Sequence, residues 1–198
     1  MPRPGEPVNS LDAPCQLCRS HSYPFDQMVC LAIYQGAVRE AVVASKLARH
    51  AALATALGGL LGEHLHHWFG AELPDQITFV PTHFIRRVQR KGLSGAAAMA
   101  SAVEKTLNVR CQSLLRLTRN VHKQSLLLDA DRPDNVRGAF VLKKRYALTG
   151  TQSLRDQHIL LVDDVLTTGS TAAEIASVLK NAGAARVTVA VVARAVRR

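Results

Sequence analysis

The feature that most constrains the fold is a pair of buried-type strands separated by one short helix near the end of the chain. Residues 158–162 (HILLV) and 187–193 (VTVAVVA) are continuous apolar runs, a pattern typical of strands covered on both faces. Between them, residues 171–182 carry apolar side chains at helical spacing and are followed by Gly183, a residue type that commonly ends helices. A strand, a helix and a strand in this length predict a βαβ unit with a parallel sheet.

The rest of the chain also alternates between strand-like and helix-like segments. Residues 37–69 lack proline and repeat apolar side chains at helical spacing, which predicts a long helix broken or bent at Gly58 and Gly59. The other expected elements are strands at 28–34 and 77–80, a helix at 94–107, and short strands within 113–145. With 198 residues, of which 47% are hydrophobic, the chain is long enough for one principal α/β domain.

Between the strand and the helix of the βαβ unit lies a segment whose side chains suit a phosphorylated sugar. The expected loop at 163–169 begins with two adjacent carboxylates, Asp163 and Asp164, and ligands of parallel sheets bind beyond the carboxyl ends of strands. The hydroxyl-rich turn at 167–171 lets backbone N–H groups and a helix N-terminus face one anion, such as a monoester phosphate. Because ionised carboxylates only accept hydrogen bonds, the pair matches the hydroxyls of a ribose.

Two other phosphate-binding loops do not fit the same residues. A Walker A loop requires Gly-x-x-x-x-Gly-Lys-Ser/Thr, whereas this segment has one glycine and no such lysine. A Rossmann Gly-x-Gly-x-x-Gly is absent as well. The structural alternative is an acidic strand end followed by an ordinary Ser/Thr helix cap; each part alone is common, and their combination at this spacing favours a ligand site.

Residues 159–171 (ILLVDDVLTTGST) resemble the phosphoribosyl-diphosphate (PRPP) binding motif of type I phosphoribosyltransferases. The resemblance implies an α/β fold in which helices flank a parallel sheet. It assigns Asp163 and Asp164 to the ribose hydroxyls and to catalysis, and it places Val165 and Leu166 against the ribose or the incoming base. The residues implied to bind the 5′-phosphate are Thr167, Thr168, Gly169, Ser170 and Thr171. Mg²⁺ would bridge the diphosphate and the ribose hydroxyls, since it prefers oxygen ligands and is often held by substrate phosphates.

Further motifs, in matching order from about residue 15 to residue 196, narrow the resemblance to the ComF family, which includes competence proteins. These motifs are Tyr34-Gln-Gly with Lys46, Val80-Pro81 with Arg86 and Arg90-Lys-Gly92, Gln124-Ser-Leu, and Arg132-Pro-Asp-Asn-Val-Arg-Gly-Ala-Phe140. The resemblance implies a part in DNA uptake or in the use of imported DNA.

The N-terminal segment departs from this family. Family members usually begin with a four-cysteine zinc module, whereas this chain has only Cys15-x-x-Cys18 at a chelating spacing. Zinc sites in proteins generally have four ligands, so we expect an incomplete remnant of the module and no bound Zn²⁺. Either the zinc module has decayed, or the chain omits the first half of that module. Residues 1–27 are expected to form a flexible tail with this residual cysteine pair, and residues 28–198 the phosphoribosyltransferase-like domain.

The net charge of +10 is concentrated in one stretch. Residues 83–145 hold 14 Lys/Arg against 4 Asp/Glu, which suits a polyanionic partner, either a diphosphate or a nucleic-acid backbone. A solvated basic face is the alternative. Aromatic residues make up 5% of the chain, so single-stranded DNA, if bound, would be held by charge rather than by base stacking. The side chains expected to neutralise a diphosphate are Lys46, Arg86, Arg90 and Lys91.

The combined prediction is a phosphoribosyltransferase-like protein that binds PRPP and is linked to competence or to the use of imported DNA, with other competence proteins as further partners. Transfer of the phosphoribosyl group, which would make it a glycosyltransferase of nucleoside metabolism, stays open because no segment has an interpretable base-binding pattern. The alternative is a non-catalytic protein that senses PRPP or handles single-stranded DNA. No apolar run reaches the ~20 residues of a membrane helix, and the N-terminus lacks the apolar core of a secretory signal. We therefore expect a cytoplasmic protein that does not insert into a membrane, with its oligomeric state open.

Overall fold

A four-stranded parallel sheet forms the centre of the computed structural model, which describes residues 23–47, 50–81, 95–118, 136–147 and 154–196. The strand order is β1 (Gln27–Ile33), β6 (Arg186–Arg194), β5 (His158–Leu166) and β2 (Gln76–Phe79), and every neighbouring pair is parallel. Both central strands, β5 and β6, are buried along most of their length, as their continuous apolar sequence predicts.

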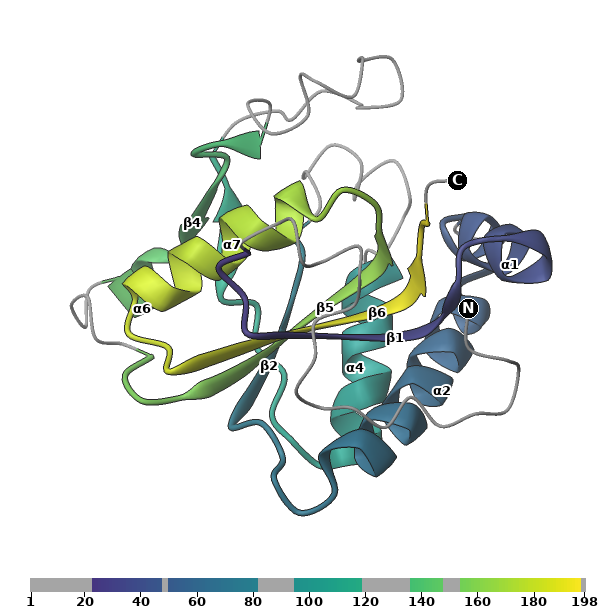
Figure 1. Ribbon diagram of the computed structural model, residues 1–198, viewed down its shortest axis with the longest axis horizontal. Coiled ribbons are helices and arrows are strands. Elements are labelled where there is room, and N and C mark those ends of the chain that lie inside the picture. The colour runs from purple at the N-terminus through teal and green to yellow at the C-terminus, as the bar shows by residue number, and fades with distance from the viewer. Residues whose placement is uncertain (1–22, 48–49, 82–94, 119–135, 148–153, 197–198) are drawn as a thin grey trace.

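Helices cover the two faces of this sheet in two separate layers (Figure 1). One layer contains α1 (Gly36–Ser45), α2 (Ala51–Phe69) and α4 (Gly95–Leu107), and on the two central strands it packs on even-numbered residues such as Leu160 and Val162. The other layer contains α7 (Ser170–Asn181) and packs on odd-numbered residues such as Ile159 and Leu161. Alternate side chains of a strand point to opposite faces, so each strand contributes to both cores. The α/β class and the βαβ unit β5–α7–β6 are confirmed.

The predicted break at Gly58 and Gly59 is wrong. Helix α2 runs unbroken through both glycines, and the long helical segment divides instead between the end of α1 at Ser45 and the start of α2 at Ala51. Gly58 faces α4, where an added Cβ would lie 2.5 Å from the main-chain oxygen of Met99. The glycine therefore permits two helices to approach closely and does not mark a break.

A second, two-stranded antiparallel sheet lies over α7. It consists of β3 (Leu115–Leu117) and β4 (Phe140–Leu142), followed by the short helix α6 (Lys144–Ala147). Phe140 is buried in the same core as α7, and Gly138, with φ of +66°, donates its N–H to Glu174 Oε1 of α7 at 2.6 Å. The short strands expected within 113–145 are thus present in the described part of that stretch.

The helices in the described ranges are all too short or too polar to cross a membrane.

Candidate functional site

The two adjacent carboxylates lie at the carboxyl end of β5, within the strand itself. The sequence predicts a loop from residue 163, but β5 continues to Leu166, with Asp163 opposite Val191 and Leu166 opposite Arg194 of β6. The loop prediction fails for these residues because carboxylates usually signal an exposed turn, while here they continue the ladder of a central strand. The pair therefore belongs to a central strand of the sheet, at the edge where parallel sheets bind ligands.

Asp163 and Asp164 have different environments. Asp163 is partly buried, and its Oδ1 accepts the backbone N–H of Asp164 at 2.9 Å. Burial, followed by the nearby charge of Asp164, raises the pKa of Asp163 to about 8, although this hydrogen bond and Lys46 act in the opposite direction. In the ligand-free protein this environment therefore favours the protonated form of the Asp163 carboxyl. Two carboxylates this close do not both ionise readily.

Lys46 neutralises the second carboxylate. Its Nζ lies 2.8 Å from Asp164 Oδ2, with the two side chains 37% and 20% exposed respectively. Lys46 is the C-cap of α1, so an element from the start of the domain meets the end of β5. The sequence proposes Lys46 as a residue for a diphosphate, and the structure brings it beside the carboxylate pair.

The turn from β5 into α7 has the conformation of an open helix N-terminus. Gly169 is the N-cap with φ of +82°, a left-handed value that favours glycine. Its carbonyl accepts the N–H of Ala173 at 2.8 Å, which begins the helix, and the hydroxyls of Thr168 and Ser170 lie 3.0 Å apart. The first N–H groups of a helix have no intrahelical acceptor, and they carry the positive end of the helix dipole. This turn and the two carboxylates thus offer donors for an anion beside acceptors for hydroxyl groups.

The two residues between the carboxylates and the turn also have distinct places. Leu166 is 5% exposed and packs into the core on the α7 side. Val165 is partly exposed and packs against the core on the α2–α4 side. Both side chains flank the strand end, and Val165 is the more accessible of the two.

Sequence reasoning gives no role to Tyr23, yet this residue contacts the turn. Its hydroxyl donates to the carbonyl oxygen of Thr168 at 3.1 Å, and a Cβ added to Gly169 would lie 3.0 Å from its ring. Tyr23 and Thr168 are 145 positions apart, so no local pattern could have linked them. The alternating aromatic residues Tyr23 and Phe25 just before β1 are the only signal in the sequence.

The remaining site predictions fall outside the described residues. These are Arg86, Arg90 and Lys91 for the diphosphate, and Cys15 and Cys18 for a metal. Within the part of the chain that the structure describes, no three His, Cys, Asp or Glu side chains gather in a way that would hold a metal ion.

The donor set at the site nevertheless fits one kind of metal binding. Mg²⁺ keeps several waters and is usually bound by one or two carboxylates together with substrate phosphates. Asp163 and Asp164 are such a pair, and a cation beside them would favour their ionised forms. The residues present therefore suit an Mg²⁺ ion that arrives with a phosphorylated ligand, and they do not form a cage for a resident ion.

Solved structures that are similar to this chain include the following two. Glutamine phosphoribosylpyrophosphate amidotransferase from B. subtilis, complexed with ADP and GMP, is 20% identical with a TM-score of 0.45, over 70% of this chain and 26% of that one. A purine phosphoribosyltransferase from Pyrococcus horikoshii is 17% identical with a TM-score of 0.39, over 85% of this chain and 88% of that one.

Sequence relatives cover the chain more completely. The DNA utilization protein YhgH of Escherichia coli O6:H1 (strain CFT073) is 32% identical over 192 residues, which is 95% of this chain and 81% of that protein. Competence protein F of Haemophilus influenzae is 29% identical over 125 residues, which is 63% of this chain and 52% of that protein. The family model for the phosphoribosyl transferase domain matches residues 80–198, which include α4, β5, α7 and β6. The chain therefore belongs to the phosphoribosyl transferase domain family, as a phosphoribosyltransferase-like member of the ComF family.

Proposed function

We propose that this protein binds PRPP together with Mg²⁺ at the carboxyl end of β5 and that it serves the use of imported DNA. The observation that carries the proposal is the carboxylate pair Asp163–Asp164 at the end of a buried strand, directly before the turn capped by Gly169. Acceptors for ribose hydroxyls and donors for a phosphate are thus held a few residues apart on one rigid βα unit.

Each part of the ligand has a matching group. The 5′-phosphate would accept hydrogen bonds from the backbone N–H groups and hydroxyls of residues 167–171, which combine with the dipole of α7. The 2′ and 3′ hydroxyls would donate to Asp163 and Asp164. Lys46, which pairs with Asp164, would exchange this partner for the diphosphate, and Arg86, Arg90 and Lys91 remain proposed as further cations. Mg²⁺ would supply positive charge between the diphosphate and the ribose oxygens.

The proposal includes transfer of the phosphoribosyl group. An acceptor base or amine would attack ribose C1 while diphosphate leaves, through a transition state with a positively charged sugar ring. The task of the protein in such a reaction is to orient the ribose and to neutralise the leaving group. The rigid position of the carboxylates on β5 supports the first part, and the closeness of Lys46 supports the second.

The biological role rests on the relatives. One is called a DNA utilization protein and another a competence protein, so we propose that the phosphoribosyl chemistry serves cells that take up or consume DNA, in the cytoplasm and with competence proteins as partners. Salvage of bases from imported DNA is a use of PRPP that fits these names.

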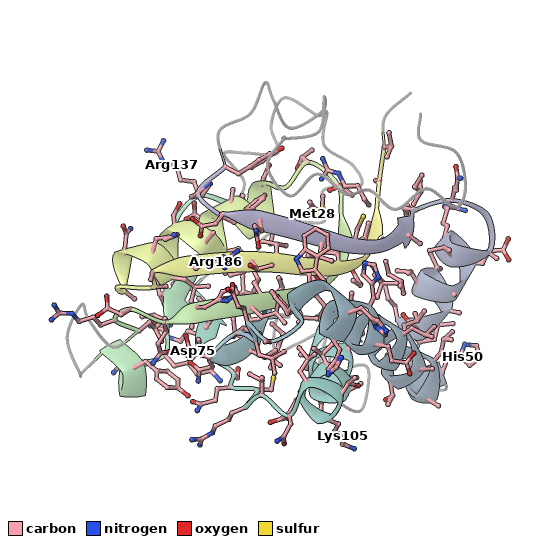
Figure 2. All side chains as sticks on the ribbon, turned by 60° about the horizontal axis from the view of Figure 1, so that its bottom comes forward. Met28, His50, Asp75, Lys105, Arg137 and Arg186 are labelled. Carbon is pink, nitrogen blue, oxygen red and sulfur yellow. The ribbon has the colours of Figure 1, made fainter. Side chains whose placement is uncertain are left out.

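Calorimetric titration of Mg²⁺–PRPP into the purified protein tests the proposal. Wild type should bind, and the double variant Asp163→Asn/Asp164→Asn should lose binding beyond detection, because both ribose acceptors become amides that cannot ionise beside a cation. Asp75→Asn is the matched control: Asp75 accepts the N–H of His158 at the amino end of β5, and Figure 2 places it at the same end of the sheet as Arg186, away from the site. Equal binding by wild type and the double variant, or no binding by a folded wild type, would contradict the proposal.

Single-stranded DNA is the second candidate ligand, favoured by the 14 Lys/Arg against 4 Asp/Glu in residues 83–145. Binding to a DNA backbone weakens steeply as salt rises, since counterions are released from each neutralised phosphate. A salt-sensitive complex that survives Asp164→Asn and weakens in Arg86→Ala/Arg90→Ala would identify this function and separate it from PRPP binding.

A further inference from the structure

The N-terminal segment that precedes β1 is attached to the helix and turn of the candidate site. Asp26 accepts the backbone N–H of Val187 at 2.7 Å, and its carboxylate pairs with Lys180 of α7 at 2.8 Å. Phe25 packs against the core on the α7 side. In Figure 1, the purple start of the described chain correspondingly lies beside α7. This segment is therefore fixed to both the sheet and the helix before it reaches Tyr23.

Tyr23 extends this attachment to the turn itself. Its ring stacks on Phe25, with centroids 4.8 Å apart and planes 14° apart, so the fixed position of Phe25 also determines that of Tyr23. The Tyr23 hydroxyl donates to the Thr168 carbonyl at 3.1 Å, and the ring covers Gly169 so closely that a Cβ there would lie 3.0 Å from it. One side chain thus contacts two consecutive residues of the turn.

These contacts determine the direction of the turn's backbone dipoles. The carbonyl of Thr168 belongs to the peptide group that supplies the N–H of Gly169, so holding the oxygen on one side fixes the N–H on the opposite side of the same plane. The left-handed conformation of Gly169, φ of +82°, is one of several that a glycine adopts readily, and the ring of Tyr23 restricts that freedom. A turn fixed in this way has its donors oriented before a ligand arrives, which lowers the ordering cost of binding.

We propose that Tyr23 is a positioning residue that holds the β5–α7 turn in its anion-binding form, an inference that rests on the phosphate role proposed above for this turn. The N-terminal segment is then part of the ligand site, although 145 positions separate Tyr23 from the residue that it holds. Tyr23 acts on the carbonyl side of the turn, so its effect on the ligand is indirect.

Tyr23→Phe and Tyr146→Phe form a matched pair of variants. Each removes one hydroxyl that donates to a nearby oxygen, the Thr168 carbonyl for Tyr23 and Gln112 Oε1 for Tyr146. Tyr146 belongs to α6, which lies toward the far end of α7 from the turn (Figure 1). Both variants should lose similar overall stability, whereas only Tyr23→Phe should change the site.

Two measurements separate this inference from the proposed function. In the ligand-free protein, hydrogen exchange of the amides in residues 168–172 should become about three- to tenfold faster in Tyr23→Phe, as expected for the loss of one hydrogen bond, and should stay unchanged in Tyr146→Phe. In calorimetry, Tyr23→Phe should weaken Mg²⁺–PRPP binding by the same factor, and Tyr23→Leu, which also removes the ring, should weaken it further.

Wild-type exchange rates in both Tyr23 variants would overturn the positioning role, whatever the ligand is. Faster exchange at the turn with unchanged Mg²⁺–PRPP affinity would overturn the link between the turn's conformation and binding. If the wild type does not bind Mg²⁺–PRPP, the proposed function fails, and the exchange experiment still decides whether Tyr23 holds the turn.

Discussion

The two helical layers that cover the sheet use glycine for opposite physical reasons. In the layer of α2 and α4, Gly58 is needed for its missing volume, because the main chain of Met99 occupies the space that a side chain would fill. In the layer of α7, Gly169 is needed for its backbone freedom, with φ of +82° at the start of the helix. The first glycine lets two helices pack closely, and the second opens the helix N-terminus that we propose as an anion-binding turn. One layer is therefore built for packing, whereas the other carries the proposed ligand site.

The two layers differ in electrostatics as well. Along α2 and α4, the buried side chains that face the sheet are apolar, among them Leu57, Leu61, Met99 and Val103. At the end of β5 next to α7, Asp163 and Asp164 lie side by side, and the pKa of Asp163 is raised to about 8 by burial and by the charge of Asp164. An arrangement that disfavours ionisation of a carboxyl lowers stability at high pH, so Asp163 should make the free energy of unfolding fall as the pH rises.

The largest effect that we expect at a single pH comes from filling the helix contact. In Gly58→Ala the new methyl group would lie 2.5 Å from the Met99 carbonyl oxygen and 2.6 Å from its Cα, atoms that no side-chain rotation can move away. Overpacking typically costs about 1–3 kcal/mol, and we expect about 3 kcal/mol here because main-chain atoms are involved. For a chain of this size the melting temperature should fall by roughly 6–12 °C.

Thermal and urea unfolding of Gly58→Ala would measure this loss, and Mg²⁺–PRPP titration below the melting temperature would show whether the other layer is affected. The separation of the two layers predicts that the folded variant keeps its affinity within about twofold, since mutations at distant sites act independently. A wild-type melting temperature would mean that the close approach of α2 and α4 is not required.

The next effect concerns the carboxylate pair, and it depends on pH. The raised pKa of Asp163 means that, between roughly pH 4 and pH 8, the folded state keeps a proton that the unfolded chain has lost. The free energy of unfolding should therefore fall as pH rises through this window, by at most about 1.4 kcal/mol per pH unit from this group. Asp163→Asn is neutral at every pH and should remove this contribution, so its stability relative to wild type should increase from pH 5 to pH 8.

Urea unfolding at pH 5, 6.5 and 8 measures that difference, and other titrating groups cancel in the comparison with wild type. Asp156→Asn is the control, because the Asp156 side chain is 88% exposed and its backbone is left-handed, a conformation that asparagine tolerates. A constant difference between Asp163→Asn and wild type across the three pH values would mean that Asp163 is ionised in the folded protein. Asp163→Asn is thus expected to gain stability relative to wild type as the pH rises toward 8.

A smaller effect on stability should follow from removing the cation beside the pair. Lys46→Met deletes the 2.8 Å ion pair with Asp164, and because Lys46 lowers the pKa of Asp163, its loss should raise that pKa further. The Lys46 side chain is 37% exposed, so the loss of stability should be below about 1 kcal/mol. Its effect on Mg²⁺–PRPP affinity should be larger, about tenfold, since a bound diphosphate would lose a nearby positive charge.

Lys105→Met is the matched control for this variant. Lys105 carries the same charge in the last turn of α4, and Figure 2 shows it on the outside of the molecule. General attraction between a basic protein and an anionic ligand would make both variants bind more weakly to a similar degree. A loss confined to Lys46→Met would instead locate the effect at the carboxylate pair.

The sequence was most informative where structure is local. The β5–α7–β6 unit could be predicted because its strands are buried on both faces and its helix has a glycine stop, all within about 40 residues. The end of β5 could not, because Asp163 and Asp164 are typical of turns and only pairing with β6 shows that they belong to a strand. The contact of Tyr23 with the turn could not be predicted for a related reason, since its partner Thr168 is 145 positions away.

The error at Gly58 has the same origin. Within one sequence, glycine in a helical segment indicates a bend, a cap or a close contact, and only the position of α4 decides between them. The separation of α1 from α2 after Ser45 had no glycine or proline to signal it. Local propensity therefore predicted which segments are helical, and tertiary packing decided where the helices end.

The smallest predicted effect uses the neighbouring glycine to sharpen the comparison between the layers. Gly59 also lies inside α2, but a Cβ added there would have no heavy atom within 4 Å. Glycine in a helix interior costs about 0.5–1 kcal/mol relative to alanine, so Gly59→Ala should stabilise the protein by that amount and raise its melting temperature by roughly 1–4 °C. Gly58→Ala, one residue earlier, should instead destabilise the protein, and the size of its effect should be severalfold larger. If both variants shifted the melting temperature in the same direction, helix propensity or general strain in α2 would explain the data, and the close packing of α2 on α4 would not.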